Sequence, residues 1–434
     1  MFPISKETLE DVKKRLAITD ITKATIRQIC ALSVDLEKVS GEDFIHLEMG
    51  NPGLPAESVG VEAEIAALQS GVANKYPNIA GIPEIKENGS RFLKAFLDID
   101  VAPEYITPTV GSMQGSYTLM TLLRQRDPAK DTMLFINPGF PVQRNQAKII
   151  GLNIESFDIF DHRGPKLEAK LEEMLGSGRV TGMIYSNPNN PAWTNFTEEE
   201  LDIIGRMATK YDAIVLEDLA YLGMDFRDDY GRPGVAPFIP TVAKHTDNYI
   251  LMLSASKIFS YAGQRIAVVA MSPKVADRYF PALDEFYNMP SFGRAYVYGV
   301  LYAASSGTTH SAQSAMAAML GAAADGRLDF IASCKEYARR GNILRRLFTE
   351  NGFHVIYCLD GERPISDGFF FTVGYKNLTS GELQSELMRY GVSSISLPST
   401  GSEQEGIRVC VSMIFDDADF TSLEKRLKSF DHEH

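Results

Sequence analysis

The sequence predicts an α/β fold, in which a mostly parallel β-sheet is flanked by helices and joined to a smaller α+β domain. Short, almost uninterrupted apolar runs alternate with amphipathic stretches in the middle of the chain, which is typical of buried parallel strands connected by helices. After about residue 308 a helical pattern dominates and is followed by shorter strands. The length of 434 residues exceeds what one ordinary hydrophobic core needs, so it favours two domains.

The chain begins with a charged helical pattern over residues 1–16 that lacks the apolar segment of a signal peptide. No apolar stretch is long enough to span a bilayer, so we expect a cytoplasmic protein. A net charge of −13 disfavours nucleic acid and anionic membranes as partners. The cysteines are scattered without a CxxC pair, which predicts reduced thiols and no metal site. They are Cys30, Cys334, Cys358 and Cys410.

Six apolar runs predict the strands of the larger sheet. They are 132–136, 153–157, 181–186, 213–217, 249–254 and 266–271. Amphipathic segments between them predict the covering helices, as in residues 197–211, where Thr197 and Glu200 fit a capping box.

The C-terminal part predicts the smaller domain. Residues 327–352 have the pattern of one long amphipathic helix that ends at Gly352. Three shorter strands follow, over 353–357, 368–373 and 407–413. We therefore expect a large domain over 48–310 and a small domain made of 1–47 and 311–434.

Polar residues follow three of the predicted parallel strands. Asn187 and Asn190 come after the third run, Asp218 after the fourth and Lys257 after the fifth. Open α/β sheets form their ligand sites at the carboxyl ends of the strands, so these side chains are expected to face one pocket. A lysine there can form a Schiff base with a carbonyl if its pKa is lowered, although a surface lysine is the alternative for Lys257 considered alone.

A second group of residues suits an anion. Gly111 follows a strand pattern and allows a tight turn, after which the N–H groups of Ser112 and Met113 open a helix. Together with Ser254 and Arg265, this turn predicts a phosphate-binding site. Many strand–helix loops share the glycine, and an isolated arginine is most often a surface charge.

The order and spacing of these motifs resemble the class I/II aminotransferase family of fold-type I pyridoxal 5′-phosphate (PLP) enzymes. S-x-S-K at 254–257 is followed by arginine eight residues after the lysine, and D-x-x-Y at 218–221 and N-P-x-N-P at 187–191 precede it. The resemblance extends from 46–56 to 406–413. It implies a PLP-dependent transferase that moves an amino group from an α-amino acid to a 2-oxo acid in two half-reactions, with the cofactor bound by the large domain.

The resemblance also implies the roles of individual residues. Lys257 would carry PLP as a Schiff base and then move the Cα proton, and Asp218 would pair with the pyridine nitrogen. Asn190 and Tyr221 would bind the phenolate oxygen of the cofactor. Four residues would hold the phosphate, namely Ser112, Met113, Ser254 and Arg265, with Gly111 forming the turn beneath it.

Further roles concern the substrate and a second subunit. Arg408 would bind the substrate α-carboxylate, which the backbone at Gly50 approaches. Phe140 would stack on the cofactor ring, for which core packing is the alternative. Tyr76 would reach the phosphate from a neighbouring subunit, which implies a homodimer with shared active sites.

The chain departs from the family pattern near the expected substrate. Trp193 stands where the family's asparagine motif usually continues with glycine, and the segment before Arg408 lacks the usual glycine and phenylalanine. The segment 286–311 looks longer than the connection usual in the family. Its Arg294 either binds a second carboxylate of the substrate or is a solvated loop residue. The amino donor and the oxo-acid acceptor therefore stay open. Alternatives are a β-lyase or a decarboxylase on the same scaffold, and a non-catalytic PLP-binding regulator, which the missing DNA-binding module disfavours.

Overall fold

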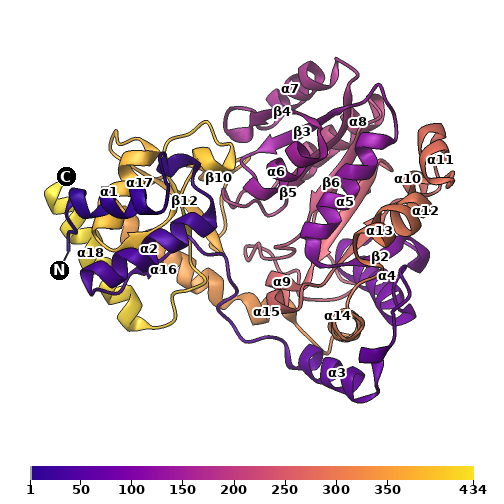
Figure 1. The fold of residues 1–434 in the computed structure, drawn as a ribbon, viewed down its shortest axis with the longest axis horizontal. Helices are drawn as coiled ribbons and strands as arrows, with labels where there is room; N and C mark the ends of the chain where they lie inside the picture. Colours follow the sequence, from indigo (N-terminus) through magenta and orange to yellow (C-terminus); the bar gives the residue numbers. More distant parts are fainter. Residues whose placement is uncertain (1) are drawn as a thin grey trace.

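The computed structural model describes residues 2–434 and contains one large and one small β-sheet, each covered by helices (Figure 1). The large sheet has seven strands. In spatial order they are β2 (Ile106–Thr109), β8 (Ala267–Met271), β7 (Tyr249–Ser254), β6 (Ile214–Asp218), β5 (Val180–Ser186), β3 (Thr132–Asn137) and β4 (Asn153–Asp158).

The six predicted runs correspond to β3 through β8, so the sequence located these strands correctly. The five strands β4, β3, β5, β6 and β7 run parallel, whereas β8 is antiparallel to both of its neighbours. The sheet is therefore mostly parallel, as predicted.

Helices cover both faces of the large sheet. Apolar side chains of β3, β6 and β7 alternate between two separate hydrophobic cores, one on each face. On one face lie α4 (Pro83–Leu97), α7 (Pro165–Leu175), α8 (Glu198–Lys210) and α14 (His310–Ala324). On the other lie α5 (Gly111–Gln125), α6 (Pro141–Ile150), α10 (Pro273–Ala276), α11 (Pro281–Tyr287), α12 (Phe292–Arg294) and a π-helix (Ala295–Leu301) that continues into α13 (Tyr302–Ser305).

The predicted capping box is confirmed at the start of α8. The Thr197 hydroxyl accepts a hydrogen bond from the Glu200 N–H at 3.2 Å, and the Glu200 carboxylate accepts one from the Thr197 N–H at 3.0 Å. The short α9 (Ala255–Ile258) follows β7 directly. α14 packs against α3 (Ser58–Gln69) and α4, at the lower edge of Figure 1.

The small sheet has four antiparallel strands in the order β14 (Ile395–Ser396), β15 (Ile407–Cys410), β12 (Phe370–Tyr375) and β9 (Phe353–Val355). Two short pairs accompany it, β1 (Ile45–His46) with β13 (Val392–Ser393), and β10 (Leu359–Asp360) with β11 (Arg363–Pro364). The helices around it are α1 (Lys6–Arg15), α2 (Ile26–Ser40), α16 (Glu336–Glu350), α17 (Ser380–Arg389) and α18 (Asp417–Glu433), and both ends of the chain lie on this side (Figure 1).

The prediction of one helix over 327–352 is wrong. The structure has α15 (Phe330–Cys334) and α16, with a turn at Lys335 between them. Phe330 packs on the aromatic side chains of α4 beside the large sheet, 5.4 Å from Phe92 between ring centroids, whereas α16 packs on α18 and β9. The two helices thus pack on different elements of one continuous core, and the helix is interrupted between them at Lys335.

The predicted domain boundary at residues 310 and 311 stays a prediction, and α14 beyond it contacts the helices of the large sheet. Within residues 2–434 we find no helix with the length and apolar character needed to cross a membrane.

Candidate active site at the carboxyl end of the sheet

Two neighbouring strands of the large sheet end at the predicted site residues. Asp218 is the last residue of β6, and Ser254 is the last residue of β7, immediately before the helix that carries Lys257. Because β6 and β7 are parallel, their carboxyl ends lie at one edge of the sheet. The structure therefore brings Asp218 and Lys257 to the same edge.

Lys257 is half-buried, and its Nζ donates a hydrogen bond to the backbone carbonyl of Gly50. Burial lowers the pKa of Lys257 to about 8, and the positive charges of Arg408 and Arg265 act in the same direction. A lysine with this pKa is partly neutral near physiological pH, so it can act as a nucleophile or as a base.

Asp218 is buried, with 6% of its surface exposed. Its Oδ2 accepts a 2.8 Å hydrogen bond from the Gln143 side-chain amide, and its Oδ1 accepts one from the Ala220 N–H. Burial raises the pKa of Asp218 to about 6, although both hydrogen bonds act in the opposite direction. Sequence reasoning missed Gln143, whose only local signal is its place in the first turn of α6.

Asn190, Tyr221 and Arg408 are linked by side-chain hydrogen bonds. The Asn190 amide donates to the Tyr221 hydroxyl at 3.5 Å, and Arg408 Nη1 donates to Asn190 Oδ1 at 3.3 Å. All three side chains are buried, and burial raises the pKa of the Tyr221 hydroxyl. The structure therefore joins residues of the large and small sheets in one network.

Arg408 lies on β15 and is 2% exposed. Its Nη2 donates to the backbone carbonyl of Glu48, and its guanidinium carbon lies 4.7 Å from the centroid of the Phe370 ring. Its Nε is buried without a hydrogen-bond partner, and no ion pair joins Arg408 to a carboxylate of residues 2–434. A buried guanidinium in this state favours a bound anion.

The residues of the predicted anion site meet at the N-terminus of α5. Gly111 has a φ of +66°, and a Cβ added there would lie 2.6 Å from Arg265 Nη2. The residue before the helix gives it no side-chain cap, so the first N–H groups, including those of Ser112 and Met113, are directed outward. The Ser254 hydroxyl accepts a hydrogen bond from the Ser256 N–H at 3.2 Å.

Phe140, Tyr76 and Arg294 differ in how they relate to this edge. Phe140 is half-buried and directly precedes α6, so it stands three residues before Gln143. Tyr76 is 90% exposed, and the structure does not bring it to the other site residues of the same chain. Arg294 is exposed and lies over the Tyr298 ring at 5.6 Å.

Trp193 is completely buried beside Tyr221. The two ring centroids are 5.5 Å apart in an edge-to-face arrangement, and the indole N–H donates to the Ser366 hydroxyl at 2.9 Å. The sequence placed Trp193 near Asn190 but gave no indication of its bond to Ser366, which precedes β12 of the small sheet.

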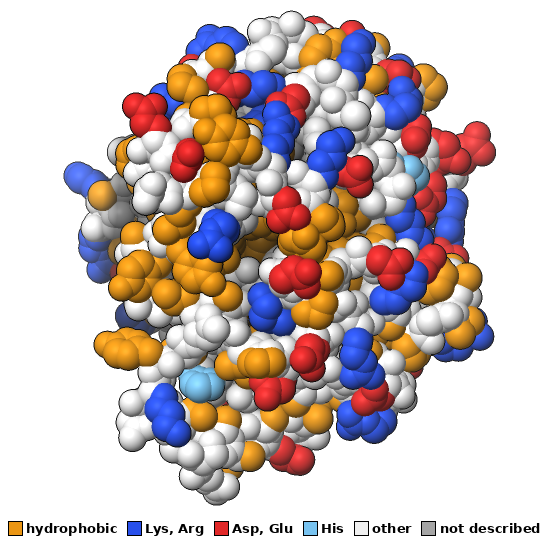
Figure 2. Space-filling view, turned by 90° about the vertical axis from the view of Figure 1, so that its right-hand side faces the viewer, with side chains coloured by type: hydrophobic (Ala, Val, Ile, Leu, Met, Phe, Trp, Pro, Cys, Tyr) orange, Lys and Arg blue, Asp and Glu red, His pale blue; other side chains and the backbone are white. Residues whose placement is uncertain are grey.

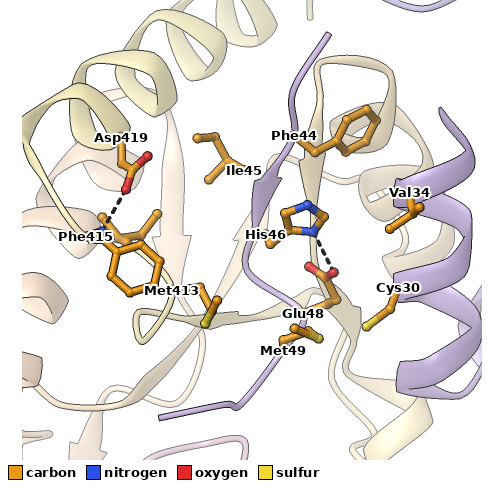
Figure 3. Close-up of a pocket in the computed structure, with 11 residues that line it drawn as sticks. Cys30, Val34, Phe44, Ile45, His46, Glu48, Met49, Met413, Phe415 and Asp419 are labelled. Carbon is orange, nitrogen blue, oxygen red and sulfur yellow. Dashed lines mark hydrogen bonds and ion pairs between the residues drawn. The ribbon is translucent and has the colours of Figure 1, made fainter. Parts of the chain in front are cut away.

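A cavity of about 340 Å³ lies behind the segment that contacts Arg408 (Figure 3). His46 and Glu48 point toward each other at its wall, joined by a 2.9 Å hydrogen bond, while Phe415 lines the opposite side. Glu48 is fully buried, and the hydroxyl of Ser393 also donates to its carboxylate. The backbone carbonyl of the same Glu48 accepts the bond from Arg408.

Among residues 2–434 no group of His, Cys, Asp and Glu side chains is placed to hold a metal ion.

The chain is similar to proteins of one known family. The profile of the family described as "aminotransferase class I and II" matches residues 42–423. Nicotianamine aminotransferase A of Hordeum vulgare is 26% identical over 265 residues, 60% of this chain and 56% of that protein. An aspartate aminotransferase of Pyrococcus horikoshii is 27% identical over 236 residues, 54% of this chain and 57% of that one.

The chain spans about half the length of these curated relatives. Solved structures match more of it. Aspartate aminotransferase from Thermus thermophilus with maleate superposes with a TM-score of 0.73 at 18% identity, covering 96% of this chain and 98% of that one. Aspartate aminotransferase from Thermotoga maritima gives a TM-score of 0.73 at 17% identity, covering 98% and 99%. At this identity the likeness shows the fold.

Proposed function

Because the chain belongs to the class I and II aminotransferase family, whose members of this fold depend on PLP, we propose that it transfers an amino group from an α-amino acid to a 2-oxo acid in two half-reactions. The observation that carries the proposal is Arg408, a buried guanidinium without a carboxylate partner in residues 2–434, linked through Asn190 to Tyr221 and close enough to Lys257 to lower its pKa. This arrangement suits a substrate that has both a carboxylate and an amine.

The residues at the sheet edge fit PLP. Asp218 is a buried carboxylate whose pKa is raised by burial, and a protonated ring nitrogen would supply a compensating positive charge. A Cβ at Gly111 would lie 2.6 Å from Arg265 Nη2, so the glycine leaves room for this guanidinium beside the N-terminus of α5, where it suits a phosphate. Lys257 would bind the cofactor covalently, and the phosphate would be held by Ser112, Met113, Ser254 and Arg265.

When bound, PLP condenses with amines and withdraws electrons from the carbon next to the nitrogen. Lys257, with its pKa near 8, takes the proton from the substrate Cα at Nζ and returns it. Asp218 would hold a proton on the ring nitrogen, and Gln143 fixes the direction of its carboxylate. Asn190 and Tyr221 would donate to the ring oxygen.

Arg408 orients the substrate. Its guanidinium, which donates to Asn190, would hold the α-carboxylate on the side of the small sheet and leave the Cα–H bond accessible to Lys257. A carboxylate held in this way is poorly placed for loss as CO₂. We therefore favour transamination over decarboxylation, and over β-elimination, which needs in addition a leaving group at Cβ.

A homodimer with shared sites is also part of the proposal. Tyr76 is 90% exposed, as expected for a side chain that acts in another subunit. Figure 2 shows hydrophobic side chains gathered around a hollow on one face of the molecule. Exposed apolar side chains on α3 and α13 support an interface, and they are Val61, Ile65, Leu68 and Tyr302.

The four cysteines are free, which suits a reducing, cytoplasmic environment.

Reduction of the PLP-loaded protein with borohydride, followed by peptide mapping, tests the covalent site. The pyridoxyl group should be found on Lys257, and a label on another lysine would overturn the assignment. The reaction itself is tested by mixing the loaded protein with a panel of amino acids and no acceptor. Stoichiometric formation of pyridoxamine phosphate and a 2-oxo acid, reversed by adding an oxo acid, supports transamination, whereas catalytic release of CO₂, or of ammonia and pyruvate, contradicts it.

A further inference from the structure

Five side chains around the substrate arginine form a closed ring of contacts. Trp193 packs edge-to-face on Phe370 at 6.0 Å between centroids, and Phe370 lies 4.7 Å beneath the Arg408 guanidinium. Arg408 donates to Asn190, Asn190 donates to Tyr221, and the Tyr221 ring packs on Trp193 at 5.5 Å. Three members, Arg408, Asn190 and Tyr221, have roles in the proposed function, and Phe370 lies between Arg408 and Trp193. Trp193 closes the ring, and within residues 2–434 no hydrogen bond or ring contact joins it to Lys257 or Asp218.

Trp193 joins the two sheets. It follows β5 of the large sheet, yet its indole N–H donates to Ser366, and its ring lies directly on Gly368, two residues before β12. A Cβ added to Gly368 would lie 2.2 Å from the indole. Because β12 pairs with β15, with Thr372 opposite Arg408, a shift of the 366–370 segment moves the strand that carries Arg408.

The backbone at Trp193 is in an unfavourable conformation. Its φ is +60°, in the left-handed region, which costs a bulky residue about 1–2 kcal/mol and suits glycine. The fold nevertheless places a tryptophan there, fully buried, with a hydrogen bond and two aromatic contacts that offset this cost. The side chain therefore has a specific partner surface, which consists of Tyr221, Phe370 and Gly368.

We infer that Trp193 is a positioning residue that sets the place of Arg408 relative to Asn190 and Tyr221, and so tunes how tightly the substrate carboxylate is bound. The inference rests on the proposed function. It assigns Trp193 to substrate recognition rather than to proton transfer, because its contacts lead to Arg408 through Phe370. Loss of the indole frees the Phe370 ring to tilt, and the guanidinium above it then loses its fixed position.

Three variants perturb this contact in different ways. Trp193→Phe keeps an aromatic edge but removes the bond to Ser366, and Ser366→Ala removes only that bond. Gly368→Ala leaves Trp193 in the chain but forces its ring away. Gly374→Ala is the control. Gly374 lies on β12, and a Cβ added there would meet only the ring of the exposed His354 within 3 Å.

The measurements separate recognition from catalysis and from folding. We expect Trp193→Phe and Gly368→Ala to raise the KM for the amino acid about tenfold or more, with kcat at saturation reduced less than about threefold. Ser366→Ala should raise KM in the same direction by a smaller factor. The dissociation constant of an unreactive 2-methyl amino acid, titrated against the PLP-loaded protein, should rise in parallel with KM. The PLP dissociation constant and the unfolding midpoint of the cofactor-free chain show whether the variants still fold.

The outcomes distinguish failure of the inference from failure of the proposed function. If the wild type neither binds PLP nor transfers amino groups, the proposed function is wrong and the inference falls with it. If the wild type is active and the Trp193 and Gly368 variants fold and bind PLP but keep the wild-type KM and 2-methyl amino acid affinity, the inference alone is wrong. A fall in kcat at unchanged KM also contradicts it, because that result assigns Trp193 to the chemical step. An equal rise in KM for Gly374→Ala contradicts it as well.

Discussion

The side-chain amide of Gln143 donates a 2.8 Å hydrogen bond to the buried carboxylate of Asp218. No other side chain of residues 2–434 donates a hydrogen bond to this carboxylate. A hydrogen bond to a charged carboxylate lowers its pKa. In Gln143→Ala, the pKa of Asp218 should therefore rise above its present value of about 6. We expect kcat/KM near pH 7 to fall about tenfold, with the acidic limb of the pH–rate profile moved to higher pH. Asn145→Ala, on the exposed face of the same helix, serves as the control. An unchanged profile in Gln143→Ala would count against this role.

Asp218 should make the cofactor-free chain less stable at neutral and alkaline pH. Its folded pKa of about 6 lies above the ordinary value of 3.8, so above pH 6 the fold holds a buried charge that the unfolded chain leaves in water. Asp218→Asn should raise the free energy of unfolding of the cofactor-free chain by about 1–3 kcal/mol near pH 8.

The same gain should shrink as the pH falls from about 6 to about 4, because the wild-type carboxyl then becomes protonated within the fold. Urea unfolding of both chains at several pH values gives the difference. The exposed Asp161→Asn is the control. A stability gain that does not depend on pH would point to a cause other than the charge.

Gly111→Ala should weaken PLP binding because the new methyl group collides with Arg265, and not only because the backbone is strained. The added Cβ would lie 2.6 Å from Arg265 Nη2 and displace that guanidinium from the anion site. Gly151 also has a positive φ, +78°, but no atom lies within 4 Å of a Cβ added there. Gly151→Ala therefore strains the backbone without a steric collision. We expect the PLP dissociation constant, measured by equilibrium dialysis, to rise about tenfold or more in Gly111→Ala and to change little in Gly151→Ala. Equal effects of both substitutions would exclude the steric explanation.

The His46–Glu48 pair should stabilise the chain over a limited pH range. Burial alone would raise the pKa of Glu48, but hydrogen bonds from His46 and Ser393 keep it below the usual value. The hydrogen bond to Glu48 holds the pKa of His46 above its usual 6.5, against the effect of burial. The Glu48 contribution is lost as the pH falls through its lowered pKa, and the His46 contribution is lost as the pH rises through its raised pKa.

His46→Ala should therefore lower the free energy of unfolding by about 1–3 kcal/mol near pH 6, and by less near pH 9, where His46 is neutral in the wild type as well. Denaturant unfolding at the two pH values measures the loss. His432→Ala, at an exposed position of α18, is the matched substitution. A larger loss of unfolding free energy near pH 9 than near pH 6 would contradict this prediction.

The parts of the site that the sequence predicted are those governed by local rules. Asp218 and Lys257 follow apolar runs, and parallel strands bring their carboxyl ends to one edge, so the pattern alone places them together. The turn at Gly111 is likewise a local signal. The motif spacing added the family and, through it, Arg408, which no periodicity singles out.

The parts that the sequence missed depend on contacts between distant segments. Arg408 and its carbonyl partner in Glu48 are 360 residues apart, and Gln143 and Asp218 are 75 residues apart. The glutamine side chain does not ionise and follows no sequence periodicity, so nothing in the sequence marks Gln143 as a partner of Asp218. The turn at Lys335 was missed for the same reason, because an uninterrupted apolar stripe does not reveal that its two halves pack against different helices and strands.

Trp193 is the only tryptophan in the chain, and it lies at the contact between the large and small sheets. All tryptophan fluorescence therefore comes from one site, in which the indole is shielded from water and hydrogen-bonded to Ser366. A motion that separates the sheets would hydrate the ring and shift its emission to the red. The wild-type protein thus carries an intrinsic optical probe of this interface, which allows its opening and closing to be followed in real time without an attached dye.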